Sequence, residues 1–85
     1  MDYRIDYKKS VAKDLKRIDK DNAKNIMDKI DQDLIHAPHR FPVLRGPFSG
    51  MRKYRVGEYR VVFVIIEDSV LILRIQDRKD VYRKK

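Results

Sequence analysis

The chain has 85 residues, of which 21 are Lys or Arg and 13 are Asp or Glu, so its formal net charge is +8. This length suits one domain, residues 1–85, and is too short for two. The absence of cysteine excludes a disulfide scaffold and a cysteine-based zinc site, and we expect no metal and no cofactor. The longest apolar run, VVFVII, is too short to span a bilayer, so we expect no membrane segment, no signal peptide and a cytoplasmic protein.

The excess of cations favours a polyanionic partner, such as nucleic acid, an anionic membrane or an acidic protein. A basic domain whose charges only keep it in solution would have the same composition. The positions of the cations in the fold must therefore decide between these interpretations.

The N-terminal part of the chain predicts a strand and a short helix. Tyr3–Tyr7 alternates aromatic or aliphatic side chains with charged ones, as a half-exposed strand does. Ser10 suits a helix N-cap. Val11, Leu15 and Ile18 then form one apolar stripe of the helix.

A second helix is predicted after the polar segment DKDN, where Asp21 or Asn22 can cap it. Proline disfavours helical backbone in the residue before it, so this helix must end near Pro38. The two amphipathic helices form a hairpin whose apolar stripes need another layer to cover. The stripe of the second helix consists of Ala23, Ile26, Met27, Ile30 and Leu34.

Two groups of polar residues in this region resemble metal sites only by their spacing. His36 and His39 are separated by Pro38 and have no third ligand near them in the sequence, so we expect a structural or solvent-exposed role. The acidic group lies on a helix among other charges, and a solvated face is the better interpretation. It consists of Asp28, Asp31 and Asp33.

The second half of the chain predicts a loop and three strands. Residues 37–50 hold all three prolines and two of the three glycines, a composition typical of a connecting loop. Strand-like runs follow at Arg52–Val56, Tyr59–Ile66 and Val70–Gln76, joined by segments short enough for hairpins. We therefore predict an α+β domain of order β-α-α-β-β-β with a short helical C-terminal tail. Its helical hairpin should pack on one face of a mainly antiparallel sheet.

The first predicted hairpin has two faces of different character. If Gly57 supplies the positive φ that a two-residue turn requires, Arg55 lies opposite Arg60 and Lys53 lies opposite Val62. Because side chains alternate between faces, Lys53, Arg55 and Arg60 share one face. The other face is apolar and should meet the helices, and it carries Tyr54, Val56, Tyr59, Val61 and Phe63.

Directly opposed like charges on a sheet cost stability, roughly 0.2–1 kcal/mol per pair, so Arg55 and Arg60 favour an anion between them. Two arginines that splay into water would lose little, but Lys53 shares their face and the C-terminal tail is basic. Guanidinium groups that hold phosphate, beside an aromatic ring that stacks on a base, suit single-stranded RNA. The tail contributes Arg78, Lys79, Tyr82, Arg83, Lys84 and Lys85. Outside the catalytic candidates, the predicted RNA-binding residues are Arg52, Lys79, Arg83 and Lys84.

Three segments together resemble the RelE/ParE superfamily of bacterial and archaeal toxins, and RelE most closely. They are YRIDYKKSVAKDLKRI, LRGPFSGMRKYRVGEYRVVFVI and DRKDVYRKK, in family order and over essentially the whole chain. The most specific part is the RVGEYRVVF hairpin, followed some twenty residues later by an arginine and a tyrosine in the pattern R-x-x-x-Y.

The resemblance implies a toxin of a type II toxin–antitoxin system, a ribosome-dependent endoribonuclease that cleaves mRNA in the A site and inhibits translation. It implies a metal-free cleavage in which the ribose 2′-OH attacks the adjacent phosphate. It also implies a cognate RelB-like antitoxin, in a toxin–antitoxin heterotetramer, and the ribosome with its mRNA as the target.

The implied catalytic residues lie on the hairpin and in the tail. Arg60 matches the family arginine that contacts the scissile phosphate, and Arg78 matches an arginine assigned to transition-state charge or leaving-group protonation. Tyr82 matches the tyrosine that stacks on the mRNA base. Lys53 and Arg55 occupy the strand where RelE carries two alternating lysines, one of them the proposed base.

The chain departs from RelE at two positions. Arginine stays protonated in proteins, so if Arg55 replaces the lysine base, Lys53 must accept the proton. Many relatives have His before the tail arginine, where this chain has Asp77, which favours catalysis by charge stabilisation and orientation. The alternatives are a ParE-like toxin that poisons DNA gyrase and a catalytically weak remnant that only binds its antitoxin.

Overall fold

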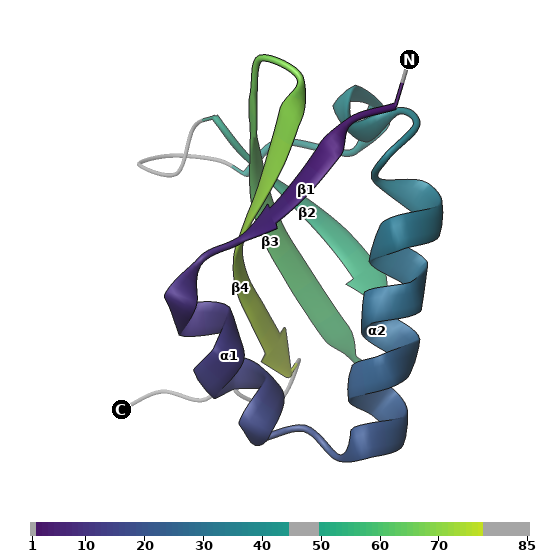
Figure 1. Cartoon of the computed structure of the whole chain (residues 1–85), viewed down its shortest axis with the longest axis vertical. Helices are drawn as coiled ribbons and strands as arrows, with labels where there is room; N and C mark the ends of the chain where they lie inside the picture. The colour runs from purple at the N-terminus through teal and green to yellow at the C-terminus, as the bar shows by residue number, and fades with distance from the viewer. Residues whose placement is uncertain (1, 45–49, 78–85) are drawn as a thin grey trace.

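The computed structural model describes residues 2–44 and 50–77. The chain begins with β1 (Arg4–Tyr7), α1 (Lys9–Lys16) and α2 (Lys20–Asp33), followed by a 3₁₀ turn, η1 (Pro38–Arg40). It continues with β2 (Met51–Val56), β3 (Tyr59–Ile66) and β4 (Ser69–Asp77) (Figure 1). The predicted order β-α-α-β-β-β is confirmed. The predicted helical tail falls on residues 78–85, outside the described ones.

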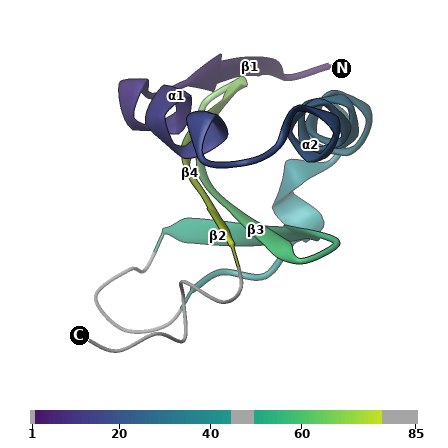
Figure 2. The same ribbon diagram turned by 90° about the horizontal axis from the view of Figure 1, so that it is seen from below.

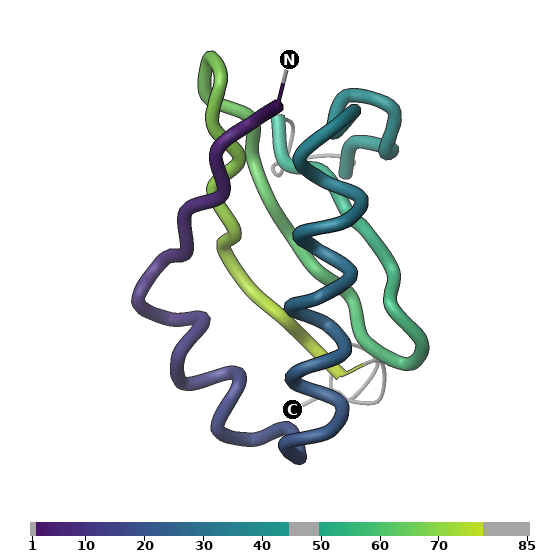
Figure 3. The backbone as a smooth tube through the Cα atoms, turned by 45° about the vertical axis from the view of Figure 1, so that its right-hand side comes forward, coloured from purple at the N-terminus to yellow at the C-terminus, as the bar shows by residue number. Residues whose placement is uncertain are grey.

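Within the described residues, the strands form one mixed sheet in the order β1-β4-β3-β2. β2, β3 and β4 are successive antiparallel neighbours, whereas β1 runs parallel to β4. Figure 3 shows this N-terminal segment lying along β4. The sheet is therefore mainly antiparallel, as predicted, with a parallel strand at one edge.

Both helices lie on the same side of the twisted sheet (Figure 2). Val11 of α1 and Ile26 and Ile30 of α2 are at most 1% exposed, so each predicted apolar stripe is buried at its centre. The predicted apolar face of the hairpin meets them, and this removal of apolar surface from water is the main force that holds the layers together. Its residues are the buried Tyr54, Val56, Val61 and Phe63, with Tyr59 partly buried against them. Neither helix in residues 2–44 has the length and apolar character that crossing a bilayer requires.

The start of α1 differs from the prediction by one residue. The helix begins at Lys9, and its N-cap, Lys8, makes no side-chain hydrogen bond to the helix end. Ser10 lies inside the helix, so its prediction as the N-cap was wrong. Its hydroxyl instead donates to the carbonyl oxygen of Leu73 on β4, at 2.9 Å. The Ser10 side chain, which the local pattern assigned to capping, thus binds a carbonyl far away in the sequence instead.

The start of α2 also differs from the prediction. Asp19 is the N-cap, and its carboxylate accepts a hydrogen bond from the backbone N–H of Asn22. The prediction of Asp21 or Asn22 as the cap was therefore wrong, because several adjacent polar residues all suit this position. The helix ends at Asp33, and Pro38 begins η1.

α1 covers the outer edge of β4 beyond the point where β1 ends. The last residue of β4 paired with β1 is Ile72, whose carbonyl oxygen also accepts from the Lys8 N–H at 2.9 Å. The buried carboxylate of Asp14 accepts from the backbone N–H of Ile75 at 2.9 Å. It also accepts from the guanidinium of Arg74, at 2.9 and 3.1 Å. Side chains of α1 therefore satisfy backbone groups of β4 at an edge where no described strand pairs with it.

Tyr54 joins β2 to the end of α2. Its hydroxyl donates to the carboxylate of Asp33 and lies 3.3 Å from the carbonyl oxygen of Lys29. Asp33 therefore faces the sheet, and its prediction on a solvated face was wrong, whereas Asp28 and Asp31 are exposed as predicted. Burial, and then the hydrogen bond to Asp33, raise the pKa of Tyr54 well above the usual value for tyrosine.

Candidate nucleic-acid interface

The hairpin of β2 and β3 has the predicted register. Arg55 pairs with Arg60, and Lys53 pairs with Val62. Gly57 has the positive φ, 58°, that the turn requires. Lys53 and Arg55 are exposed and Arg60 is partly buried. By the alternation of side chains, these three cations lie on the face of the sheet opposite the core, and we call them the cationic face.

β4 adds two polar residues beside the cationic face. Gln76 pairs with Arg60 across β3, and Arg74 pairs with Val62. Nη2 of Arg60 donates to Oε1 of Gln76 at 3.4 Å. Nε of Arg60 is buried and has no hydrogen-bond partner among residues 2–44 and 50–77.

Sequence reasoning missed Arg74 and Gln76 as neighbours of Arg60. Their alternation around Ile75 was a signal that they share a face, but it did not fix the register of β4 against β3. A bulge between Val62 and Phe63 shifts this register, and such a bulge has no clear mark in the sequence.

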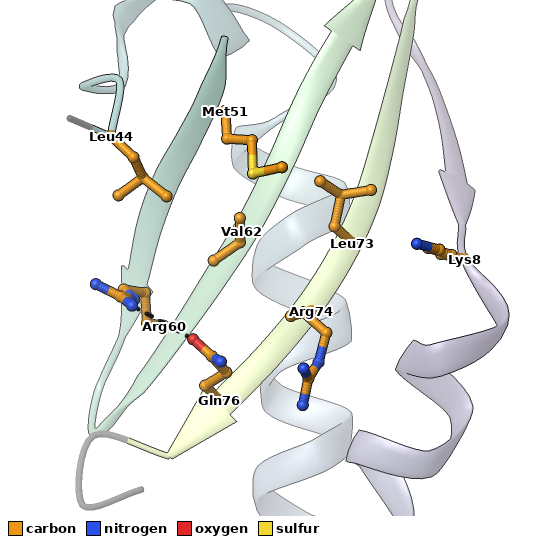
Figure 4. Close-up of a pocket in the computed structure, with 8 residues that line it drawn as sticks. All are labelled: Lys8, Leu44, Met51, Arg60, Val62, Leu73, Arg74 and Gln76. Carbon is orange, nitrogen blue, oxygen red and sulfur yellow. Dashed lines mark hydrogen bonds between the residues drawn. The ribbon is translucent and has the colours of Figure 1, made fainter. Parts of the chain in front are cut away.

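A groove of about 470 Å³ crosses this side of the sheet (Figure 4). In Figure 4, Met51, Val62 and Leu73 lie in its middle, and Arg60 and Gln76 meet below them. Every charged side chain in its lining is a cation, so the groove attracts anions, and its apolar wall can accept a flat ring. The full lining consists of Lys8, Leu44, Met51, Arg60, Val62, Leu73, Arg74 and Gln76.

The cations of the groove differ in how much of their charge is available. The hydrogen bonds that Arg74 donates to the Asp14 carboxylate raise the pKa of Arg74, so this guanidinium stays charged but is already paired with a carboxylate. Arg60 has a neutral partner, Gln76, and an anion would meet its full charge. Arg60 is therefore the better candidate for phosphate binding.

Most of the sequence matches a known family. A family model described as "ParE toxin of type II toxin-antitoxin system, parDE" matches residues 5–82. The chain belongs to this family of toxins. Among curated proteins, no sequence matches this toxin.

Solved structures similar to the toxin include two complexes of RelE with its antitoxin. In the toxin–antitoxin complex RelBE2 from Mycobacterium tuberculosis, the matching chain is 25% identical with a TM-score of 0.86, over 92% of the toxin and 100% of that chain. In the RelE–RelB complex from Pyrococcus horikoshii, the matching chain is 26% identical with a TM-score of 0.70, over 92% of the toxin and 97% of that chain.

A third structure, a mutant of E. coli toxin RelE in the free state, is 18% identical with a TM-score of 0.74, over 94% of the toxin and 87% of that chain. Together with the family match, these structures place the toxin in the RelE/ParE superfamily and confirm the RelE-like α+β fold.

Arg52, which the sequence predicts as an RNA-binding residue, holds a loop of the toxin itself. Its Nη1 donates to the carbonyl oxygens of His39 at 3.1 Å and Phe41 at 2.7 Å. Alternation along β2 sets it on the opposite face from Lys53 and Arg55. The structure therefore does not bring Arg52 to the cationic face.

The remaining predicted site residues belong to the tail. Arg78 and Tyr82, predicted as catalytic, and Lys79, Arg83 and Lys84, predicted to bind RNA, lie outside the described residues. Their placement relative to Arg60 stays a prediction.

Each histidine of the toxin contacts a residue near the N-terminus. His36 Nδ1 lies 3.3 Å from the carboxylate of Asp2, and His39 Nδ1 lies 3.2 Å from the hydroxyl of Tyr3. Within residues 2–44 and 50–77, no group of three or more His, Cys, Asp or Glu side chains is placed to hold a metal ion.

Proposed function

We propose that this toxin is a ribosome-dependent endoribonuclease that cleaves mRNA in the ribosomal A site and so inhibits translation. The observation that carries the proposal is the gathering of Lys53, Arg55 and Arg60 on one open face, beside a groove whose charged groups are all cations. The similarity of the fold to RelE is consistent with this activity.

The proposed cleavage needs no metal. The ribose 2′-OH attacks the adjacent phosphate, and the products are a 2′,3′-cyclic phosphate and a 5′-OH. A base must accept the proton of the 2′-OH, cations must neutralise the charge that grows on the phosphate, and an acid must protonate the leaving 5′-oxygen.

We assign these tasks first to the described residues. Arg60 holds the scissile phosphate, because its guanidinium is partly buried beside the groove and has a neutral partner. Arg55 keeps its proton throughout, so it contributes charge. Lys53, an exposed amine on the same face, is then the base that accepts the proton of the 2′-OH.

The tail residues complete the proposed site. Arg78 is assigned to charge stabilisation or protonation of the leaving oxygen, and Tyr82 to stacking on the mRNA base. Lys79, Arg83 and Lys84 are assigned to the RNA backbone. These assignments rest on the resemblance of the tail to that of RelE.

The proposed partner is a RelB-like antitoxin that binds the toxin in the cytoplasm, in a heterotetramer. Two structures similar to the toxin are toxin–antitoxin complexes of RelE with RelB. Neutralisation by such a partner would leave translation running until the antitoxin is lost.

A second candidate function is poisoning of DNA gyrase, which the ParE description of the family model favours. The two functions differ in their targets and can be separated in one experiment. The toxin is added to a translation extract with a defined mRNA and, in parallel, to DNA gyrase with supercoiled plasmid. Cuts in translated mRNA with 5′-OH ends, and an intact plasmid, are expected. Gyrase-dependent DNA breaks with intact mRNA would overturn the proposal in favour of the second function.

A further inference from the structure

Arg60 lies between two unlike neighbours in one row of the sheet. Arg55 faces it from β2 and Gln76 faces it from β4. One neighbour repels a cation and the other can accept a hydrogen bond from it. The only direct hydrogen bond of the Arg60 side chain to another described residue goes to Oε1 of Gln76, at 3.4 Å.

This contact also fixes the orientation of the Gln76 amide. A guanidinium has only donors, so the oxygen of the amide must face Arg60 and its NH₂ group must point elsewhere. Both Arg60 and Gln76 line the groove (Figure 4). Oε1 of Gln76 is therefore turned toward Arg60, and the guanidinium and the amide NH₂ group are donors from which a phosphate can accept.

The backbone that carries Gln76 is itself held firmly. The residue before it, Ile75, donates its N–H to the buried Asp14, and Arg74 binds the same carboxylate through two nitrogens. These three hydrogen bonds fasten β4 to α1 immediately next to Gln76. A fixed backbone limits where the Gln76 side chain can go and so limits the positions open to Arg60.

We propose that Gln76 is a positioning residue for Arg60, and so for the phosphate that Arg60 holds; this inference rests on the proposed function. Arginine has a long side chain with many rotamers, and an unheld guanidinium must lose that freedom when the phosphate binds. Gln76 removes part of this cost before the RNA arrives. It acts through Arg60 and takes no part in proton transfer.

The test is a double-mutant cycle in a single-turnover mRNA cleavage assay on ribosomes. Gln76→Met keeps the length of the side chain and leaves only a weak sulfur acceptor. We expect the cleavage rate to fall roughly three- to tenfold, as for loss of a hydrogen bond to a charged group that is partly solvated. In the Arg60→Ala background, Gln76→Met should change the residual rate less than about twofold.

Gln32→Met, the same change at an exposed glutamine of α2, is the matched control and should cleave like wild type. A loss that is equally large in the Arg60→Ala background would overturn the proposal, because Gln76 would then act independently of Arg60. Wild-type cleavage by Gln76→Met would also overturn it.

A measurement on the free toxin separates failure of this inference from failure of the proposed function. In ¹⁵N-labelled protein, the Nε–Hε signal of Arg60 is identified by its loss in Arg60→Lys. We expect it to shift or broaden in Gln76→Met and to stay unchanged in Gln32→Met. If the wild type cuts no mRNA, the proposed function fails and this spectrum alone decides the positioning role. An unchanged signal in Gln76→Met would contradict the role whatever the cleavage result.

Discussion

Tyr54 stands between Lys53 and Arg55 in sequence, yet it faces the opposite side of the sheet. Its ring is buried and packs at 5.0 Å from the ring of Phe41, and its hydroxyl binds Asp33 at the end of α2. The residue thus holds β2 against the helix layer from behind. The positions of the two cations depend on this attachment, although Tyr54 itself does not reach the cationic face.

Removing the Tyr54 hydroxyl tests the attachment. We expect Tyr54→Phe to lower the free energy of unfolding by about 1 kcal/mol, because one hydrogen bond to a partly solvated carboxylate is lost. Urea unfolding followed by circular dichroism measures the change. Tyr3→Phe, which removes a hydroxyl bound to His39 in an exposed contact, is the control and should change stability less. An equal loss in both variants would show that the Asp33 contact stabilises no more than the exposed contact with His39.

The tyrosines also predict how stability depends on pH. Burial raises the pKa of Tyr54, and burial with the charge of Asp31 raises the pKa of Tyr7 to about 12, whereas an unfolded tyrosine has a pKa of roughly 10. Both groups are neutral when protonated, so their contribution is complete below the unfolded pKa and is lost as the pH rises through the folded pKa.

We therefore expect wild type to unfold at a lower urea concentration at roughly pH 11 than at roughly pH 9. The drop should be smaller in Tyr54→Phe, which no longer carries one of the tyrosines with a raised pKa. Chemical denaturation at the two pH values measures it. A drop of the same size in both proteins would contradict the role assigned to Tyr54.

At the scale of elements, side chains of α1 make hydrogen bonds to the backbone along the end of β4, as a neighbouring strand would. Asp14 is 7% exposed and accepts hydrogen bonds from a backbone N–H and from Arg74. The Arg74 side chain is 48% exposed, so water can replace part of what it loses when Asp14 is removed. Ile75 is only 2% exposed, so water has less access to its backbone N–H and replaces less of the lost hydrogen bond.

Substitution of Asp14 tests the fastening of α1 to β4. We expect Asp14→Ala to lower the free energy of unfolding by about 2–3 kcal/mol, below the usual cost of breaking a fully buried ion pair because Arg74 is half exposed. Asp14→Asn keeps an acceptor for Ile75 and should cost less. Asp28→Ala, at an exposed site on α2, should be near neutral in the same urea titration. A neutral Asp14→Ala would refute the fastening.

The turn of the β2–β3 hairpin fixes the register that pairs Arg55 with Arg60. Gly57 has φ 58°, and a Cβ there would meet no atom within 4 Å, so substitution costs only backbone strain. We expect Gly57→Ala to destabilise by about 1 kcal/mol. Asn tolerates this conformation better, so Gly57→Asn should cost less. If thermal unfolding ranks Asn below Ala, the turn does not hold the positive φ in solution.

The sequence predicts the elements of the fold better than it predicts their contacts. The hairpin register follows from a local turn, so the pairing of Arg55 with Arg60 was predictable from Gly57 alone. The roles of Ser10 and Asp33 were not, because each hydrogen-bonds a residue far away in sequence, Leu73 and Tyr54 respectively. Gln76 was missed for the same reason, since its place beside Arg60 depends on a strand pairing that a bulge displaces.

At the scale of the whole molecule, the net charge of +8 sets the long-range attraction to RNA, and the cationic face sets where it acts. Binding to single-stranded RNA should weaken with salt, because each neutralised phosphate releases counterions. The logarithm of the binding constant should fall linearly with the logarithm of the salt concentration.

Single substitutions separate the cationic face from the overall charge. Lys53→Gln should reduce the salt slope by about 0.7, the contribution of one contact to a single strand. Lys24→Gln removes the same charge from the exposed side of α2 and should leave the slope nearly unchanged. Fluorescence anisotropy with a labelled oligonucleotide measures both. Equal slopes in the two variants would mean that the RNA does not contact Lys53 of the cationic face.

The central claim is that Arg60 holds the phosphate of an mRNA that the toxin cleaves on the ribosome. The most direct measurement is the cleavage rate of a defined mRNA by wild type and by Arg60→Ala, with and without purified ribosomes, with the ends of the products mapped. We predict that wild type cuts the mRNA only when ribosomes are present and leaves 5′-OH ends. The rate in Arg60→Ala should be lower by about 100-fold or more. This variant should unfold at the same urea concentration as wild type. Cleavage by a folded Arg60→Ala at the wild-type rate, or intact mRNA with the wild-type toxin on ribosomes, would contradict the claim.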